Sequence, residues 1–394
     1  MAQFPTGFLW GAATASHQIE GAACNGGRSE SVWDVFSHTD GKVAHGHTGD
    51  VACGHHHRVD DDVAMMADLG LQSYRFSISW TRVMPDGRGR INQEGLGFYQ
   101  RLVDRLLGHG IVLCPTLFHW DLPQALEELG GFRNRDTVSW FGDYAALMVR
   151  ELGDRVHMWS TFNEPWCYAY LGHASGVHAP GLTDPHAAVT VAHHELLAHG
   201  LALQTMRAER NDLQLGVVIN PSNIVSDAQR PADDAQVRLI DAIHNRWWFD
   251  ATLRNNYPAD LLESYGPLAD AIRAGDTETI SQPLVRLRDD YPGLPPIYIT
   301  ENGCACDDPI IDGRCADPRR IDYLDQHLRA IRHAIDAGVD IRGYYQWSLM
   351  DNFEWSLGYD KRFGLVHVDF ETLDRTPRNS ASWYRDVIRR NGLE

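Results

Sequence analysis

The sequence of 394 residues lacks both a long apolar run and an excess of basic side chains. A helix that crosses a bilayer needs about 20 consecutive apolar residues, and no stretch approaches that length. The 35 Lys and Arg residues are outnumbered by 53 Asp and Glu residues, so the formal net charge is −18. Because nucleic-acid phosphates are bound by clustered Lys and Arg, the composition argues against a nucleic-acid partner as well as a membrane role.

A secretory leader and a disulfide framework are also lacking. Residues Met1–Pro5 contain neither the basic region nor the apolar core of a signal peptide. The 7 cysteines are an odd number, and no secretory segment supports their pairing. We therefore expect a reduced, cytoplasmic protein.

The sequence does contain a regular alternation of β-prone runs and helix-period stretches. The candidate strands are Phe8–Thr14, Ser73–Ser79, Ile111–Phe118, Val156–Phe162, Leu215–Asn220, Ile297–Thr300 and Gly343–Leu349. The clearest helical patterns are Asp60–Leu69, Gly95–Leu107, Thr137–Leu152, Ala187–Arg210 and Ile321–Ala337. Strand–helix alternation of this length, with no linker or repeat, predicts an α/β protein in which residues 1–394 form a single TIM-type (β/α)8 barrel domain.

One strand of the expected eight is missing. Between Pro221 and Pro296 the sequence shows helix-like patterns at Asp233–Leu253, Leu261–Arg273 and Leu284–Asp290, and no strand run. The barrel is therefore predicted to be irregular or incomplete in this segment.

Two glutamates stand where strands are predicted to end. Glu164 lies in Thr161–Pro165 (Thr-Phe-Asn-Glu-Pro), and Glu301 lies in Ile299–Gly303 (Ile-Thr-Glu-Asn-Gly). A polar residue at the carboxyl end of a barrel strand is typical of a catalytic group. Two such carboxyl groups on different strands are what glycoside hydrolysis requires, one as acid and one as nucleophile or base.

These motifs, with four others in the same order, resemble glycoside hydrolase family 1, which includes β-glucosidases and β-galactosidases. The other four are Phe8–Gly21, Tyr74–Trp80, Phe118–Pro123 and Trp347–Trp355. The resemblance covers nearly the whole chain. It implies a retaining β-glycosidase with a TIM-type barrel and no cofactor.

Roles follow from the resemblance motif by motif. It implies that Glu164 is the general acid and base, that Glu301 is the nucleophile, and that Arg75 holds the charge of Glu301. We expect apolar surroundings and a nearby carboxylate to raise the pKa of Glu164, because it must stay protonated near neutral pH. Asn163 resembles the residue that contacts the sugar 2-hydroxyl.

The substrate-binding set also matches the family. Gln18, His119, Asn163 and Glu354 resemble its hydroxyl partners, while Trp120, Trp347 and Trp355 resemble the aromatic lining of the sugar pocket. Trp166 resembles a residue on the aglycone side, and Phe363 resembles a residue of the pocket wall. Members that act on phospho-sugars replace the pair Glu354-Trp355, so the resemblance implies unphosphorylated sugars.

Two clusters could suggest a metal, and both have a simpler interpretation. His55–His57 followed by Asp60–Asp62 resembles the polar helix start found at this place in the family, whose chemistry needs no metal. Cys304, Cys306 and Cys315 do not follow a standard zinc spacing. We expect them to be free thiols in a surface loop, and we expect no metal and no cofactor.

The sequence departs from the family before the nucleophile strand. Ser281–Pro283 leads directly into Leu284–Gly293, so the segment around the sixth barrel strand is absent, together with a Tyr that hydrogen-bonds the nucleophile in the family. Losing a hydrogen bond to a charged group costs about 1.5–3 kcal/mol. We expect the gap to be closed by a narrowed barrel, by a rearranged Pro221–Pro296 segment, or by a second subunit in a homo-oligomer.

The leading hypothesis is a retaining β-glycosidase of the β-glucosidase type that acts on small-molecule β-glycosides. A transglycosidase is an alternative, because an altered pocket wall could favour an acceptor sugar over water. A sugar-binding pseudoenzyme weakened by the deletion is another. The glycone contacts do not distinguish glucose from galactose or fucose.

Overall fold

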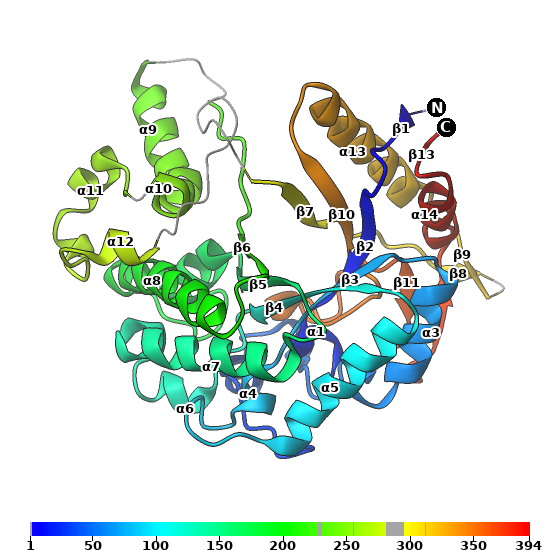
Figure 1. Ribbon diagram of the computed structural model, residues 1–394, viewed down its shortest axis with the longest axis horizontal. Helices are drawn as coiled ribbons and strands as arrows, with labels where there is room; N and C mark the ends of the chain where they lie inside the picture. Colours follow the sequence, from blue (N-terminus) through cyan, green and yellow to red (C-terminus); the bar gives the residue numbers. More distant parts are fainter. Residues whose placement is uncertain (1, 227–230, 255, 281–294, 312) are drawn as a thin grey trace. The chain divides into compact units, whose positions relative to one another are not determined.

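The computed structural model describes residues 2–226, 231–254, 256–280, 295–311 and 313–394 (Figure 1). Within it, contacts gather into two compact units. The first unit contains residues 1–123, 154–159 and 296–394, and the second contains residues 124–153 and 160–295. Each unit is described by itself below.

The core of the first unit is a parallel sheet with the strand order β4-β3-β2-β10-β7. Its strands are β2 (Leu9–Ala13), β3 (Ser73–Ser77), β4 (Val112–Phe118), β7 (Ile297–Asn302) and β10 (Ile341–Trp347). The register aligns Gly11 with Ser73, Tyr74 with Leu113 and Gly343 with Leu9. Strand β3 is buried at every position, as expected for a parallel strand covered on both faces.

Helices and short ribbons complete the first unit. The helices are α1 (Ser16–Ile19), α2 (Val32–Ser37), η1 (Ala44–Gly46), η2 (His55–His57), α3 (Val59–Asp68), α4 (Trp80–Val83), α5 (Gln93–Gly108), α13 (Pro318–Asp336), η7 (Trp355–Leu357) and α14 (Asn379–Arg390). The antiparallel ribbons are β1 (Ala2–Gln3) with β13 (Gly392–Leu393), β8 (Ile310–Ile311) with β9 (Arg314–Cys315), and β11 (Val366–Val368) with β12 (Arg375–Pro377).

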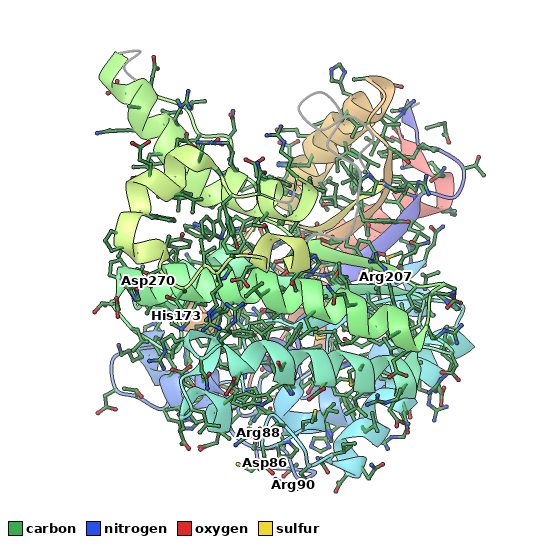
Figure 2. All side chains as sticks on the ribbon, turned by 60° about the vertical axis from the view of Figure 1, so that its left-hand side comes forward. Asp86, Arg88, Arg90, His173, Arg207 and Asp270 are labelled. Carbon is green, nitrogen blue, oxygen red and sulfur yellow. The ribbon has the colours of Figure 1, made fainter. Side chains whose placement is uncertain are left out.

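Local sequence explains where these helices begin and which face they bury. Ser31 and Asp34 form a capping box at the start of α2, in which each side chain accepts from the other residue's backbone N–H. Helix α5 buries Leu96, Tyr99 and Leu102, which recur at helical spacing. The turn before α5 is exposed and charged, with Arg90 paired to Asp86 at 2.8 Å (Figure 2).

The second unit is mainly helical. Its elements are α6 (Gln124–Glu127), η3 (Gly131–Arg133), α7 (Asp136–Leu152), the end of β5 (Met158–Asn163), η4 (Cys167–Leu171), α8 (Pro185–Glu209), β6 (Gln214–Val218), α9 (Pro231–Asp241), η5 (Ala242–Arg246), α10 (Trp247–Arg254), α11 (Ala259–Tyr265), η6 (Gly266–Ala269) and α12 (Asp276–Ile280). Strands β5 and β6 are neighbours. Asp184 caps α8, and Pro185 occupies its first turn. Helix α7 packs closely on α8, where a Cβ at Gly142 would lie 3.1 Å from Leu201.

The seven expected strands are all present, each within about two residues of its predicted ends. The helical patterns are also present, with two corrections. The stretch Asp233–Leu253 is divided by the π-helical turn η5, and the helix expected over Leu261–Arg273 ends earlier, at Tyr265. The pattern at Leu284–Asp290 lies outside the described residues. In chain order, the described elements between β6 and β7 are all helical, so no eighth barrel strand is found among them.

Candidate active site

Glu301 is the penultimate residue of strand β7 and is paired with an arginine from strand β3. Arg75 Nη1 donates to Glu301 Oε2 at 2.6 Å and to the Thr300 carbonyl at 3.1 Å, while Arg75 Nε donates to Thr116 Oγ1 at 3.2 Å. The arginine side chain is 1% exposed and the glutamate side chain 19%. A fixed cation therefore meets a mostly buried carboxylate at the end of a strand.

Two opposing effects act on the Glu301 carboxyl. Burial raises its pKa, because removing water disfavours the charged form. The positive charge and the hydrogen bond of Arg75 lower its pKa. The ion pair is thus the contact that favours the ionised form of Glu301 in this buried position.

The turn after Glu301 is held against strand β10. A Cβ on Gly303 would lie 1.6 Å from the carbonyl oxygen of Trp347, so only glycine fits there. Asn302 Nδ2 donates to Tyr323 Oη at 3.0 Å, and Tyr344 Oη donates to Asn302 Oδ1 at 3.0 Å. The carboxylate and the end of β10 are therefore kept in a fixed relation.

Gln18 links helix α1 to the loop that carries Glu354. Its amide nitrogen lies 3.0 Å from Asn352 Oδ1, 2.9 Å from the Phe353 carbonyl and 3.3 Å from Glu354 Oε2. The side chain is fully buried, and among the described residues its Oε1 has no hydrogen-bond partner. Gln18 Oε1 can therefore accept a hydrogen bond from a ligand hydroxyl.

An aromatic cluster surrounds these polar groups. The ring of His119 stacks on Trp347 at 6.0 Å and on Trp355 at 5.9 Å, and Trp120 lies 4.8 Å from Trp355. Phe363 packs on the core cluster that contains Trp347. Flat apolar rings beside hydroxyl-binding groups are well suited to the apolar faces of a sugar ring.

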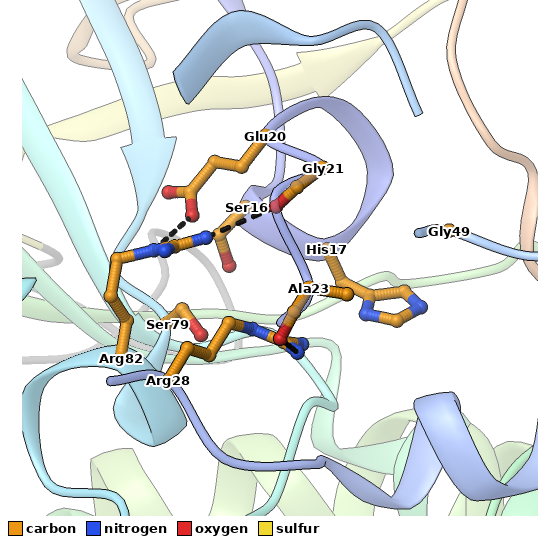
Figure 3. Close-up of a pocket in the computed structure, with 9 residues that line it drawn as sticks. All are labelled: Ser16, His17, Glu20, Gly21, Ala23, Arg28, Gly49, Ser79 and Arg82. Atoms are coloured by element: carbon orange, nitrogen blue, oxygen red, sulfur yellow. Dashed lines mark hydrogen bonds and ion pairs between the residues drawn. The ribbon is translucent and has the colours of Figure 1, made fainter. Parts of the chain in front are cut away.

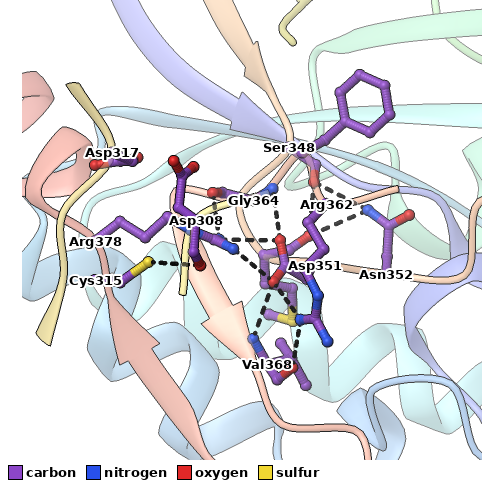
Figure 4. A network of polar contacts seen from close by, with 12 residues as sticks. Asp308, Cys315, Asp317, Ser348, Asp351, Asn352, Arg362, Gly364, Val368 and Arg378 are labelled. Carbon is purple, nitrogen blue, oxygen red and sulfur yellow. Dashed lines mark hydrogen bonds and ion pairs between the residues drawn. The ribbon is translucent and has the colours of Figure 1, made fainter. Parts of the chain in front are cut away.

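A buried ionic network fixes the loop after β10 (Figure 4). Arg378 makes two bonds of 2.9 Å to the carboxylate of Asp351, and Arg362 Nη1 donates to the same group at 2.8 Å. The Gly364 N–H adds a further bond at 3.0 Å. Because Asn352, Phe353 and Glu354 are the three residues after Asp351, this network helps to set the position of the groups that Gln18 contacts.

A small polar cavity lies beside helix α1, and its lining is largely paired internally (Figure 3). Arg82 donates to Glu20 Oε2 at 2.9 Å and to the Gly21 carbonyl at 3.1 Å, and Arg28 donates to the Ala23 carbonyl at 3.1 Å. His17, which lines the cavity, stacks on Trp355 at 5.8 Å. These contacts hold α1, and hence Gln18, in position.

Glu164 lies in the second unit, directly after strand β5. Its φ of 40° is in the left-handed region, which is uncommon for a side chain other than glycine. Its N–H donates to the Val218 carbonyl of β6 at 2.9 Å. Asn163, the preceding residue, is fully buried. The backbone is therefore strained where it presents the carboxyl, as is common at functional sites.

Cys167 contacts the Glu164 carboxyl. The thiol donates to Glu164 Oε2 at 3.3 Å, and Asn220 Nδ2 lies 3.5 Å from Cys167 Sγ. Trp166 lies nearby in the chain, and its ring packs edge-on against His244 at 4.4 Å. A carboxyl, a thiol, an amide and two aromatic rings thus lie close together within the second unit.

The predicted site residues therefore fall into two sets. The first unit holds Gln18, Arg75, His119, Trp120, Glu301, Trp347, Glu354, Trp355 and Phe363, and the second holds Asn163, Glu164 and Trp166. Sequence reasoning did not include Cys167. Its signal was its place three residues after Glu164, at the first residue of η4.

The expected surface loop of free thiols is present, but two of its thiols are buried. Cys304, Cys306 and Cys315 are free, and Asp307, Pro309 and Arg314 around them are exposed, whereas Cys306 is 6% exposed and Cys315 is 1% exposed. Arg320 holds the start of the loop through the Cys304 carbonyl at 2.5 Å and also bonds the Arg362 carbonyl at 3.1 Å. His55 Nδ1 bonds Asp62 at 2.8 Å, and the described residues contain no group of three or more ligand-type side chains that could hold a metal.

Known proteins resemble this chain over nearly its whole length. The family model described as Glycosyl hydrolase family 1 matches residues 1–284 and 266–393. The chain is 47% identical to thermostable beta-glucosidase B of Thermobispora bispora, with 99% of this chain and 91% of that protein covered. It is 40% identical to beta-glucosidase A of Acetivibrio thermocellus, with 99% of each covered.

Solved structures give the same result and confirm the α/β barrel. The psychrophilic beta-glucosidase BglU from Micrococcus antarcticus matches with a TM-score of 0.96 and 42% identity, over 99% of this chain and 98% of that one. The beta-glucosidase from Thermotoga maritima, solved in complex with galacto-hydroximolactam, matches with a TM-score of 0.93 and 38% identity over 100% of both chains.

The alignment with the Thermobispora protein also bears on the missing segment. It runs over 443 positions, whereas this chain has 394 residues, so part of the relative has no counterpart here. The family match is also divided, with its two parts meeting at residues 266–284. Both observations agree with a deletion ahead of strand β7.

Among the described residues, no helix is long and apolar enough to cross a membrane.

Proposed function

The chain belongs to glycosyl hydrolase family 1, and we propose from this that it is a retaining β-glucosidase that hydrolyses terminal, unphosphorylated β-D-glycosides. The observation that carries the assignment of roles is the 2.6 Å bond between Arg75 and Glu301. A buried carboxylate at the end of a barrel strand, with a fixed cation that favours its ionised form against the effect of burial, is suited to nucleophilic attack.

In the first step, Glu301 attacks the anomeric carbon of the substrate. The glycosidic C–O bond breaks as an ester bond forms between the sugar and Glu301, and Glu164 gives its proton to the departing oxygen. Arg75 favours the ionised carboxylate that this attack requires. A Tyr that bonds the nucleophile in the family has no counterpart in the sequence, so Arg75 carries more of this task.

In the second step, Glu164 acts as a base. It takes a proton from water, whose oxygen attacks the anomeric carbon and releases Glu301 as a carboxylate. Both carboxyl groups return to their starting states, and the two displacements preserve the anomeric configuration. No cofactor enters this chemistry.

Specificity for the sugar comes from Gln18, Glu354 and the aromatic cluster. Gln18 Oε1 accepts from a sugar hydroxyl, and Glu354, held 3.3 Å from Gln18, accepts from another. Because a carboxylate repels a phosphate group, Glu354 favours an unphosphorylated sugar. Trp347 and Trp355 supply apolar surface for the sugar ring, while Trp166 serves the aglycone.

Burst kinetics with an activated aryl β-glucoside test this proposal. Wild type should release a burst of phenol as the glycosyl-enzyme accumulates, and Glu301→Gln should show no burst. Glu164→Ala should be rescued by azide, which needs no base, with a β-glycosyl azide as the product.

Two other results would overturn the proposal. If wild type turns over no faster than Glu301→Gln while glucose still binds, the protein is a sugar-binding relative of an enzyme. If the burst is present but the glycosyl group goes mainly to an added sugar or alcohol rather than to water, the protein is a transglycosidase.

A further inference from the structure

We propose that Cys167 is a positioning residue for the reaction: its thiol, oriented by Asn220, holds the carboxyl of Glu164 in place as that group gives up and recovers a proton. The inference rests on the proposed function, because it requires Glu164 to be the acid and base. It goes beyond that function by adding a side chain that acts through its contact with Glu164.

Two contacts connect Cys167 to Glu164. Cys167 Sγ donates to Glu164 Oε2 at 3.3 Å, and the Cys167 N–H donates to the Glu164 carbonyl at 2.8 Å. The backbone bond closes the turn through Pro165 and Trp166, which fixes the backbone position from which the Cys167 side chain extends. Cys167 is 7% exposed, so its side chain is confined to this neighbourhood.

Asn220 gives the thiol its direction. Asn220 Nδ2 lies 3.5 Å from Cys167 Sγ, so the amide donates to the sulfur while the S–H remains directed at the carboxyl. Asn220 is itself held, since His244 Nε2 bonds the Asn220 carbonyl at 3.0 Å. The His244 ring packs on Trp166 at 4.4 Å, which closes the chain of contacts beside Glu164.

The weakness of a thiol donor fits the task of Glu164. This carboxyl must be protonated in the first step and ionised in the second, so a strong donor would favour one state too much. A thiol is among the weakest donors in proteins and can fix a rotamer with little effect on the proton. Charge-assisted bonds, such as that of Arg75 to Glu301, do the opposite.

Several titratable groups around this segment keep one charge state near neutral pH, whereas burial raises the pKa of Glu195 in α8 well above its usual value. Tyr170 stacks on Trp166, and burial raises its pKa well above the usual value. His199 bonds Thr161 of β5, and burial lowers its pKa to about 4. Burial also lowers the pKa of His244. The alkaline limb of the rate profile is assigned to Glu164 by its loss in Glu164→Ala.

The test compares full-length Cys167→Ala and Cys167→Ser with wild type on two substrates. An alkyl β-glucoside needs a proton from Glu164 to leave, whereas the leaving group of a dinitrophenyl β-glucoside departs without one. With Cys167→Ala, kcat/KM for the alkyl glucoside should fall about threefold relative to that for the dinitrophenyl glucoside. The alkaline limb should move up by about half a pH unit, because a donor to the ionised form is lost.

The conservative variant and the second partner sharpen the test. Cys167→Ser keeps a donor at this position, and a hydroxyl is a stronger donor than a thiol. It should therefore restore the ratio of the kcat/KM values for the two substrates and move the alkaline limb to a lower pH than in wild type. Asn220→Ala should act like Cys167→Ala with a smaller effect, because the thiol remains but is no longer directed. Cys24→Ser removes an exposed thiol and should match wild type.

Failure would take a different form for each proposal. If both substrates slow equally and the alkaline limb stays in place in Cys167→Ala and Asn220→Ala, Cys167 only packs and the inference is wrong. If wild type has no alkaline limb, or Glu164→Ala retains it, Glu164 is not the acid and the proposed function itself fails.

Discussion

The two candidate catalytic carboxyl groups are held in opposite ways. Glu301 is bonded at 2.6 Å by a buried arginine from another strand. Glu164 is bonded at 3.3 Å by a thiol three residues away on its own segment. The first contact carries a full charge and favours a single protonation state, whereas the second is neutral and weak.

This difference fits the roles proposed for the two groups. A nucleophile has to be ionised whenever substrate arrives, so a strong and permanent cation suits it. An acid that later becomes a base has to exist in both states within one turnover, so it needs direction without a large bias. The contrast teaches that a retaining site can be recognised by the unequal strength of the contacts on its two carboxyl groups.

The largest effect is expected from breaking the strong contact. Arg75→Met leaves the Glu301 carboxylate buried without its cation, and breaking one side of a buried pair costs about 3–5 kcal/mol. We expect kcat/KM to fall by about a hundredfold to a few thousandfold. The pKa of Glu301 rises when the cation is lost, so the acidic limb of the pH profile should move to higher pH. An unchanged acidic limb would contradict this account. Arg75→Lys keeps the charge, so its kcat/KM should lie between those of wild type and Arg75→Met.

A smaller effect is expected from displacing Glu301 without touching its charge. Gly303→Ala places a methyl group 1.6 Å from the Trp347 carbonyl, so the turn after Glu301 must move. Forced overpacking costs about 1–3 kcal/mol, and we expect kcat/KM to fall about tenfold or more with a lower Tm. Gly108→Ala, at the end of α5 with open space around it, is the matched control and should behave like wild type.

Acid should weaken the unit of Glu164 more than the unit of Glu301. Burial lowers the pKa of His173, His178, His193 and His199 in the second unit to about 4. In the first unit it lowers the pKa of His17 and His56 to about 4 and that of His119 well below its usual value, so the second unit holds four such histidines and the first three. Because these folded pKa values lie below the unfolded value of 6.5, the unfolded chain binds more protons between pH 4 and 6.5. Their contribution to stability is complete above pH 6.5 and is lost as pH falls toward 4.

Hydrogen exchange at pH 7 and pH 5 measures this difference. Between pH 7 and pH 5, the free energy of opening should fall more for the peptides of α8 than for the sheet of the first unit. Each histidine should contribute about 2 kcal/mol or less to this fall. His199→Gln cannot take up a proton, so it should reduce the loss in α8. Equal loss in both units, or no change in His199→Gln, would show that these histidines do not govern acid stability.

The smallest effect is expected at the sugar contact. Gln18→Ala removes an acceptor for one hydroxyl and the amide that bonds the loop at Asn352 and Phe353. A hydrogen bond of this kind contributes about 1 kcal/mol, so kcat/KM for a β-glucoside should fall about tenfold at most while both limbs of the pH profile stay in place. Gln93→Ala, exposed at the start of α5, should be neutral. A shifted limb in Gln18→Ala would mean that the sugar pocket and the carboxyl groups are coupled.

The fold could be predicted because buried parallel strands leave uninterrupted apolar runs. All seven strands were found this way, and the errors lie at their ends. Strand β10 begins at Ile341, two residues before its predicted start, because the exposed and charged Arg342 interrupts the run. The Arg75–Glu301 pair was also expected, since both residues lie in family motifs. The family motifs contain the residues that are expected to contact the substrate, so they predict this pair.

The missed contacts depend on geometry that no local pattern encodes. The reach of Cys167 to Glu164 requires the left-handed φ of Glu164 and the turn that opens η4. The burial of the Cys306 and Cys315 side chains was missed because neighbouring residues of the loop, among them Asp307, are exposed. In the structure Arg320, paired with Asp317 at 3.0 Å, holds the Cys304 carbonyl beside them. Long-range polar contacts of this kind come from tertiary structure alone.

The Asp351 network has a consequence for how this protein can be recombined. One carboxylate joins the loop after β10, the segment at Arg362 and the residue that precedes α14. In a chimera that keeps Asp351 but takes its C-terminal part from a relative without an arginine at position 378, Asp351 would be buried with Arg362 as its remaining cation in this network. For protein engineers, the loop after β10 and the C-terminal helix of this barrel have to be exchanged together, and crossover points belong before β10 rather than within residues 347–378.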